Sequence, residues 1–362
     1  MSAKTTRASN LELLRILCML LIIGDHLTGQ GGIADYSTLP SSFAFSLIGC
    51  GSRIACSVFV CIGCWFLCEQ PFRTRRPLSL WFSLWLYTVP VTVLCALGGL
   101  DVSFGALRWA LFPASTRQLW FISDYLTLLV CMPLLARILH GLPRGAHRGL
   151  LLALALPLIA YPTLFAEDGA VSDLVWMFLY EYLLVAYLRR YPDNRLSVLL
   201  RRRAAALALG LGLPLLNTAA RAWLEWQGLT GSKACQYVAY YRTGLGALPN
   251  LLAALALFFL FQGLDLGCRR WINALAGTTL GVYILHQIPA SRDFLWNGVF
   301  QAQAHRGSVP YALFVVAAVF AAGALIDSAR TALVMRPLEN SRWFRALCEK
   351  GDALAARLAP RD

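Results

Sequence analysis

Two side chains suited to chemistry lie in an apolar segment near the start of the chain, which reads ELLRILCMLLIIGDHL from Glu12 to Leu27. An arginine such as Arg15 binds anions, and a histidine such as His26 gains or loses a proton near neutral pH. Each residue of an α-helix turns about 100°, so side chains eleven residues apart point within about 20° of one another. Arg15 and His26 therefore share one helix face, about 16 Å apart along the axis, and together they predict a polar cavity between helices.

Each of these side chains also has a simpler interpretation. Arg15 could be an anchor whose charged end reaches the membrane surface, paired with Glu12 three residues earlier. His26 could be a helix-end histidine bonded to a neighbouring carbonyl group. Asp25 points roughly 80° away from Arg15, which makes it a weaker member of the group. A charge at the centre of a membrane helix costs at least about 2.5–3.5 kcal/mol, which favours a function for the pair.

The composition is that of an integral membrane protein. Of the 362 residues, 58% are hydrophobic and 14% are charged, whereas soluble domains carry about 25% charged residues. Long apolar runs recur from end to end, and the residue alternation of membrane strands is absent. We expect an all-α fold with about ten spans, near residues 11–29, 44–68, 78–98, 119–139, 148–165, 172–188, 204–220, 247–264, 272–289 and 310–329.

Basic residues determine the expected orientation. They gather in alternate connecting segments, at about residues 73–76, 137–148, 189–203 and 269–270, and after residue 330. By the positive-inside rule, these segments and both termini are cytoplasmic, so the net charge of +13 reflects topology and indicates no nucleic-acid partner. The longest outer loop covers about residues 221–246. We expect a cytoplasmic tail (1–10), a membrane domain (11–330) and a basic cytoplasmic tail attracted to anionic lipid (331–362).

Three further ionisable groups lie within the predicted spans. Arg53 is one candidate to stabilise a developing negative charge. Its alternative is an ion pair with one of three acids, namely Asp25, Asp124 or Glu181. Glu181 either forms that pair or lines the cavity.

The eleven cysteines predict neither a disulfide framework nor a metal site. Nearly all of them lie in apolar runs. Cys61, Cys64 and Cys68 share a helix face, but no histidine or carboxylate accompanies them there. The chain also lacks a phosphate-binding glycine loop and a G-x-S-x-G nucleophile motif, so we expect no metal and no serine nucleophile of that kind.

Five segments in chain order resemble the membrane acyltransferase-3 family. NLELLRILCMLLIIGDHL has the family's arginine and histidine with ten residues between them, at Arg15 and His26. SVFVCIGCWFLCE is similar to the family's second helix, and FRTRR is similar to its short basic loop, with Arg73 and Arg76 at the two motif arginines. QLWFISDYLTLLVCMPLL and GTTLGVYILHQIP resemble two later helices, the second of which matches its histidine to His286. The resemblance covers roughly residues 10–330.

The resemblance implies an O-acyltransferase at the cell membrane, an enzyme that transfers groups other than aminoacyl groups. It would take an acyl group, usually acetyl, from cytoplasmic acyl-CoA and pass it to a hydroxyl group of an extracytoplasmic glycan or lipid-linked sugar. Arg73, Arg75 and Arg76 would bind the donor's phosphates, although topology alone also accounts for this cluster. Arg15 would guide the pantetheine arm of the donor, and His26 would act as general base.

Other residues would act on the outer side or line the cavity. Arg53 would stabilise the oxyanion, and His286 would either bind acceptor hydroxyls or serve packing. Glu12, Asp124 and Glu181 complete the set of cavity candidates. The chain departs from the family's frequent Ser-Gly pair in the second helix, where it has Gly63 and a cysteine, so a small packing site is kept without the hydroxyl.

Two functions of other classes compete with this interpretation. A transporter or flippase of a glycan or lipid-linked glycan would also use arginine, histidine and glutamate within the membrane. Many such transporters are built from internal repeats, and the sequence has no pair of matching halves. A sensor or scaffold would leave the shared face of Arg15 and His26 without a purpose.

Overall fold

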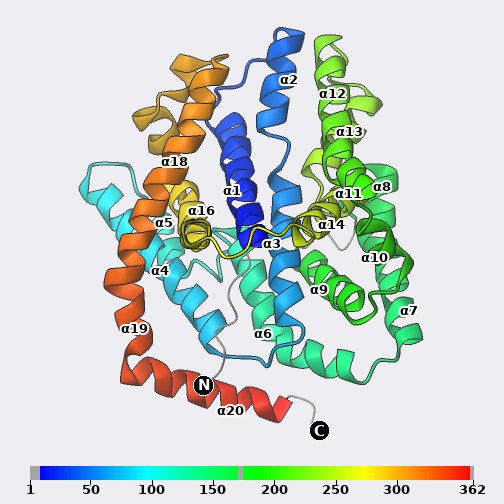
Figure 1. Cartoon of the computed structure of the whole chain (residues 1–362). Helices are drawn as coiled ribbons and strands as arrows, with labels where there is room; N and C mark the ends of the chain where they lie inside the picture. Colours follow the sequence, from blue (N-terminus) through cyan, green and yellow to red (C-terminus); the bar gives the residue numbers. More distant parts are fainter. Residues whose placement is uncertain (1–8, 170–173, 359–362) are drawn as a thin grey trace.

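The computed structural model describes residues 9–169 and 174–358, and every regular element in these ranges is a helix (Figure 1). The predicted all-α class is therefore confirmed. Seven helices in the described ranges are long and apolar enough to span a membrane, which makes the chain a multi-pass membrane protein. They are Leu39–Leu67, Arg75–Leu97, Trp120–His140, Arg144–Phe165, Arg203–Trp226, Lys233–Gln262 and Val309–Asn340. The count of ten spans and the orientation stay predictions.

Three predicted spans fall outside this set of seven. The helix α1 (Ser9–Gln30) is long enough, but Glu12, Arg15 and Asp25 interrupt its apolar character. The helix α9 (Leu174–Arg190) has 17 described residues, and residues 172–173 of the predicted span lie outside the described ranges. The predicted span 272–289 consists of two short helices, α15 (Arg270–Ala276) and α16 (Thr279–Gln287), separated at Gly277 and Thr278.

The helix ends differ from the predicted ones at two other places. The predicted span 44–68 falls almost wholly within the candidate span Leu39–Leu67, but that span is interrupted between α2 (Leu39–Ile48) and α3 (Ser52–Leu67) by a break that contains Gly49 and Gly51. Glycine favours such breaks because it costs more conformational entropy in a helix than other residues. The predicted outer loop at 221–246 is largely helical, because α12 (Leu213–Trp226) continues into it and α13 (Lys233–Thr243) lies within it.

The helix α1 lies at the centre of the bundle (Figure 1) and contacts α3, α14 (Leu248–Gln262), α15, α16 and α18 (Val309–Arg330). Its surroundings are protein on most sides, which explains how it holds charged residues at membrane depth. Large apolar side chains on the outer helices point away from the bundle instead, for example Leu94 and Leu97 on α4 (Arg75–Leu97). This arrangement places the polar groups inside and presents an apolar surface to lipid.

The end of the chain packs against the start of α4. After α18 the chain continues through η5 (Thr331–Met335) and α19 (Arg336–Asn340) into α20 (Arg342–Leu358), which lies across the lower end of the bundle in Figure 1. Asp352 Oδ1 on α20 accepts a hydrogen bond of 2.6 Å from the backbone N–H of Thr74. Glu339 on α19 forms a 2.5 Å ion pair with Arg75. The described part of the predicted tail, residues 331–358, is therefore largely helical and attached to the bundle, and residues 359–362 lie outside the described ranges.

The remaining elements complete three of the spans or connect them. They are α5 (Phe104–Leu111), α6 (Trp120–His140), α7 (Arg144–Ala155), η1 (Leu156–Ala160), α8 (Tyr161–Phe165), α10 (Arg195–Leu200), α11 (Arg203–Leu207), η2 (Ala208–Gly212), α17 (Pro289–Asp293), η3 (Phe294–Val299) and η4 (Ala302–His305). Of these, α6 is the one that contributes most to the site described below, because its first turns face α3 and α16.

Candidate active site

Two histidines from opposite ends of the chain lie side by side in the upper half of the bundle. His26 is in the last turns of α1, and His286 is near the end of α16. His26 Nδ1 lies 2.9 Å from His286 Nε2, and the two ring centroids are 5.1 Å apart. His286 is fully buried, whereas His26 is partly exposed. The structure therefore brings together the two histidines that the sequence singled out.

The hydrogen bonds define which ring nitrogens carry protons. His286 Nδ1 lies 2.6 Å from the backbone carbonyl oxygen of Val282, which can only accept, so Nδ1 carries the proton. In the neutral ring, His286 Nε2 carries no proton, so it accepts a hydrogen bond from the N–H group at His26 Nδ1. This leaves His26 Nε2 as an unprotonated nitrogen that makes no hydrogen bond to any described residue. His26 is thus held in the tautomer that a general base requires.

A pair of amides lies next to the histidine pair. Gln30, one turn after His26, donates to Gln287 Oε1 at 3.3 Å, and Gln287 donates back to Gln30 Oε1 at 3.0 Å. Gln30 is exposed, whereas Gln287 is buried. Two consecutive cross-links therefore join α1 to α16 at this height of the bundle.

A cavity of about 250 Å³, called the passage below, follows the same face of α1. Arg15, Met19 and Ile22 line it. They are spaced four and three residues apart on one face of α1, and His26, four residues further on, lies on the same face. The rest of its lining is mostly apolar and comes from α3, α4, α6, α15 and α16, including the rings of Phe59, Phe121 and Tyr125. Tyr283 also lines the passage, and its ring centroid is 6.4 Å from that of His26.

A second, larger cavity of about 760 Å³, called the wide cavity below, occupies the lower half of the bundle. It shares Arg15, Leu80, Tyr125 and Leu280 with the passage, so the two cavities adjoin at the level of Arg15. Gly63 lines it opposite Tyr125, and a Cβ atom at Gly63 would collide with the Tyr125 hydroxyl group. The small residue in the second-helix motif is therefore required for close packing of α3 against α6.

The predicted donor-binding arginines differ in where they point. Arg76 lines the wide cavity and donates to the side chain of Gln70 and to the carbonyl oxygen of Pro71. Arg75 points away to Glu339, and Arg73 is exposed and lines none of the described cavities.

Glu12 and Arg15 form the ion pair that the sequence suggested as one alternative. Their closest atoms are 3.4 Å apart, and both side chains line the wide cavity. Arg15 Nε is buried and has no hydrogen-bond partner in the described ranges. Arg15 is therefore both a partner of Glu12 and a cation with an unused N–H group at the junction of the two cavities.

Two arginines of the wide cavity come from the end of α18 and from α19, and the second of them, Arg336, lies in the segment predicted to be a tail attracted to lipid. Arg330 Nη2 lies 2.8 Å from Asp327 Oδ1, and its guanidinium lies over the Tyr87 ring at 4.7 Å. The Tyr87 hydroxyl donates to the same carboxylate oxygen at 2.6 Å. Asp327 fits against α16 because Gly281 has no Cβ atom there to collide with it. Arg336 also lines the cavity, and its only sequence signal was its basic charge after the last span.

Arg53, near the start of α3, has no acidic partner among the described residues. Its guanidinium is 4.7 Å from the centroid of the Trp120 ring, and its Nη1 atom is buried without a hydrogen bond to any described residue. Among the described residues, Arg53 forms none of the ion pairs considered from the sequence.

The acids considered as its partners are engaged elsewhere. Asp124 forms a 2.9 Å ion pair with Arg117. Glu181 is fully buried and accepts a 2.5 Å hydrogen bond from Ser57. Neither acid lines the passage or the wide cavity, so the structure does not bring them into this site.

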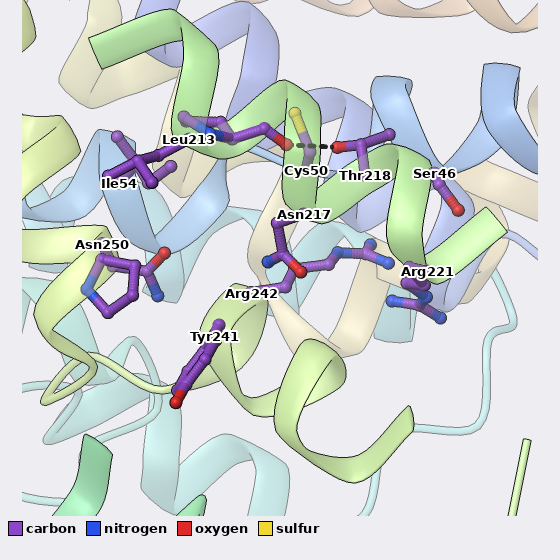
Figure 2. Close-up of a pocket in the computed structure, with 12 residues that line it drawn as sticks. Ser46, Cys50, Ile54, Leu213, Asn217, Thr218, Arg221, Tyr241, Arg242 and Asn250 are labelled. Atoms are coloured by element: carbon purple, nitrogen blue, oxygen red, sulfur yellow. Dashed lines mark hydrogen bonds between the residues drawn. The ribbon is translucent and has the colours of Figure 1, made fainter. Parts of the chain in front are cut away.

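Asp25, the third acid, holds the upper end of α1 in place. Arg242 on α13 lies 2.9 Å from Asp25 Oδ1 and also donates to the carbonyl oxygen of Gly49 at 2.7 Å. Figure 2 shows the small pocket that Arg242 and Arg221 line on this side of the molecule. Its volume of about 20 Å³ suits one water molecule and excludes a larger substrate. Arg242 therefore positions the residue next to His26 and does not belong to a substrate pocket.

Comparison with known proteins identifies a family for the chain. A family model described as an acyltransferase domain, that of the acyltransferase-3 family, matches residues 9–327. No curated protein and no solved structure gives a significant match. The matched range contains both histidines and Arg76, and it ends before Arg330 and Arg336.

Proposed function

The chain belongs to the acyltransferase-3 family, and from this premise we propose that it transfers an acyl group, usually acetyl, from cytoplasmic acyl-CoA to a hydroxyl group outside the membrane. The acceptor class is a glycan, a lipid-linked sugar or a related molecule of the cell envelope. The observation that carries this proposal is that the wide cavity adjoins the passage, and that the passage extends to Tyr283, whose ring centroid is 6.4 Å from that of His26.

The two cavities suit the two parts of an acyl-CoA molecule. The wide cavity is large and has arginines in its lining, which bind phosphate groups in two-point hydrogen bonds. The passage is narrower and mostly apolar, which suits the extended pantetheine arm that carries the thioester. Arg15 lies where the two cavities adjoin and offers an unused N–H group to that arm. The wide cavity opens at the end of the bundle that the positive-inside rule places in the cytoplasm.

His26 performs the proton transfer in this proposal. The acceptor's hydroxyl oxygen attacks the thioester carbonyl carbon, and its proton passes to His26 Nε2. His286 holds His26 in the correct tautomer, because His286 Nε2 accepts a hydrogen bond from the N–H group at His26 Nδ1. The carbon–sulfur bond then breaks, the proton returns from His26 to the leaving thiolate, and the products are an ester and free CoA.

The negative charge of the tetrahedral intermediate needs a donor nearby. Arg53 is the candidate, because its buried Nη1 atom has no partner in the described ranges and it stacks on Trp120, whose ring contacts that of Phe121 in the lining of the passage. A donor fixed in a water-poor site stabilises such a charge far better than water does. Trp120 holds the guanidinium from one face and thereby limits its motion.

Transfer of label tests the proposed function. The purified protein in nanodiscs is incubated with acetyl-CoA labelled in the acetyl group and with an extract of envelope glycans. We expect label on the glycan as an ester that mild alkali removes. Movement of glycan across the membrane without any need for CoA, together with unlabelled glycan, would contradict the proposal and support a transporter.

A further inference from the structure

The wide cavity contains two arginines that no carboxylate neutralises. Arg15 is paired with Glu12, and Arg330 is paired with Asp327. Among the described residues, Arg76 bonds only to the Gln70 amide and to a carbonyl oxygen, and Arg336 has no hydrogen bond or ion pair. Both therefore keep a full positive charge available to a ligand.

The acidic side chains of the same cavity are occupied by other partners. Glu339 is the acid nearest in sequence to Arg336, but it turns to α4, where it accepts hydrogen bonds from Arg75 at 2.5 Å and from Ser79 Oγ at 2.6 Å. Asp327 already accepts from Tyr87 and from Arg330. An anion that enters the cavity thus encounters Arg76 and Arg336 without competition from these carboxylates.

We propose that Arg336, from the segment after α18, and Arg76, from the start of α4, together bind the phosphate groups of the acyl-CoA donor. This inference rests on the proposed function and adds to it a residue outside the range matched by the family model. Arginine is suited to this role because its guanidinium group donates two parallel hydrogen bonds to a phosphate. A single cavity of about 760 Å³ contains both side chains, so one ligand can contact both.

The end of the chain holds Arg336 in position through α19 and α20. The ion pair between Glu339 and Arg75 attaches α19 to α4, and the hydrogen bond between Asp352 and the Thr74 backbone attaches α20 to the segment just before α4. These contacts join the two parts of the chain that supply the two phosphate-binding arginines. The segment after α18 is thus part of the donor site as well as a neighbour of the membrane.

Binding of CoA itself to the full-length protein in nanodiscs tests this proposal. Isothermal titration is done with the wild type, with Arg336→Gln and with Arg345→Gln, a matched control because Arg345 is exposed on α20 and lines none of the described cavities. We expect Arg336→Gln to weaken CoA binding roughly tenfold, the scale of one hydrogen bond to a charged group. Arg345→Gln should bind as the wild type does. Arg336→Lys should fall between the two, because it keeps the charge and loses the second hydrogen bond.

A second ligand separates phosphate binding from damage to the fold. Pantetheine lacks the nucleotide and its phosphates, so its ability to inhibit transfer should be the same in Arg336→Gln and in the wild type. Three results would each overturn the role of Arg336. They are equal CoA affinity of Arg336→Gln and the wild type, a loss of CoA affinity in Arg345→Gln as large as that in Arg336→Gln, and a loss of inhibition by pantetheine in Arg336→Gln as large as its loss of CoA affinity. Such a result leaves the proposed function standing if labelled glycan still forms, whereas absence of both CoA binding and label in the wild type would refute both proposals.

Discussion

The lower and upper halves of the bundle differ in how far their polar side chains are paired with one another. The lower half has a wide cavity of about 760 Å³ with arginines that keep unused hydrogen-bonding capacity. The upper half pairs His26 with His286 and Gln30 with Gln287, and the pocket that Arg242 lines beside Asp25 has room for about one water molecule. Under the proposed function, this difference predicts a donor side that is formed in advance and an acceptor side where the paired side chains around His26 control access.

The largest effect is expected where the two halves meet. Ile22→Trp adds a large ring within the passage, between Arg15 and His26. Because the thioester would no longer reach His26, we expect acyl transfer to fall by more than roughly 100-fold, since misplacement by about 1 Å already costs that much. CoA binding in the wide cavity should not change. Measurements of labelled ester and of CoA affinity on the same preparation check this, with Ile22→Val as the control. Full transfer by Ile22→Trp would show that the donor takes another route.

The next largest effect concerns the partner of the general base. His286→Ala removes the acceptor that holds the His26 tautomer, so we expect the maximal rate to fall by about tenfold to a hundredfold, less than loss of the base itself. His286→Gln retains a side-chain acceptor and should recover part of the rate. The profile of rate against pH, taken at saturating donor, distinguishes this role from a packing role. If the two variants were equally impaired and their pH profiles matched that of the wild type, packing would be the correct explanation.

An intermediate effect is expected for the arginines of the lower half. Arg76→Ala should raise the KM for acetyl-CoA roughly tenfold and leave the rate at saturation nearly unchanged, because it removes binding that ground state and transition state share. Arg73→Ala is the matched control, since Arg73 is exposed outside the wide cavity. Equal losses at low and at saturating donor would contradict a role of Arg76 in donor affinity. Equal effects of the two variants would favour general attraction by the basic loop.

The smallest effect is expected for the amide pair. Gln30→Ala removes one hydrogen-bonded cross-link between α1 and α16, but Gln30 is exposed and water can replace part of it. We expect a loss of about 1 kcal/mol in stability and less than threefold in transfer rate. Thermal unfolding and the transfer assay measure the two quantities. A loss of rate as large as that of His286→Ala would give the amide pair a direct part in acceptor binding.

The sequence predicted the helical class, and the spacing of Arg15 and His26 predicted a polar first helix, because spacing alone defines direction on a single helix. His286 was singled out only by the resemblance of its segment to the family. The sequence could not predict that His26 bonds to His286, since that contact depends on how α1 packs against α16. The breaks at Gly49 and at Gly277 were also missed, because apolar composition continues through them.

The sequence was least informative about the lower cavity. Topology alone accounts for basic residues after the last span, so nothing distinguished Arg330 and Arg336 from residues that only face lipid headgroups. The three arginines of the FRTRR loop looked equivalent, although only Arg76 lines the wide cavity and Arg75 is paired with Glu339. Such differences depend on side-chain direction at the end of a helix, which charge and spacing do not define.

The most direct test of the account is a single-turnover measurement on His26→Ala, because the account proposes that the unprotonated Nε2 atom of His26 is the general base. Protein loaded with labelled acetyl-CoA is mixed with acceptor, and the rate of ester formation is compared with that of the wild type at equal CoA occupancy. We expect a loss of about 10²- to 10⁴-fold, the usual contribution of a general base, with CoA affinity unchanged. Ester formation within threefold of the wild-type rate would show that His26 is not the base and would contradict the account.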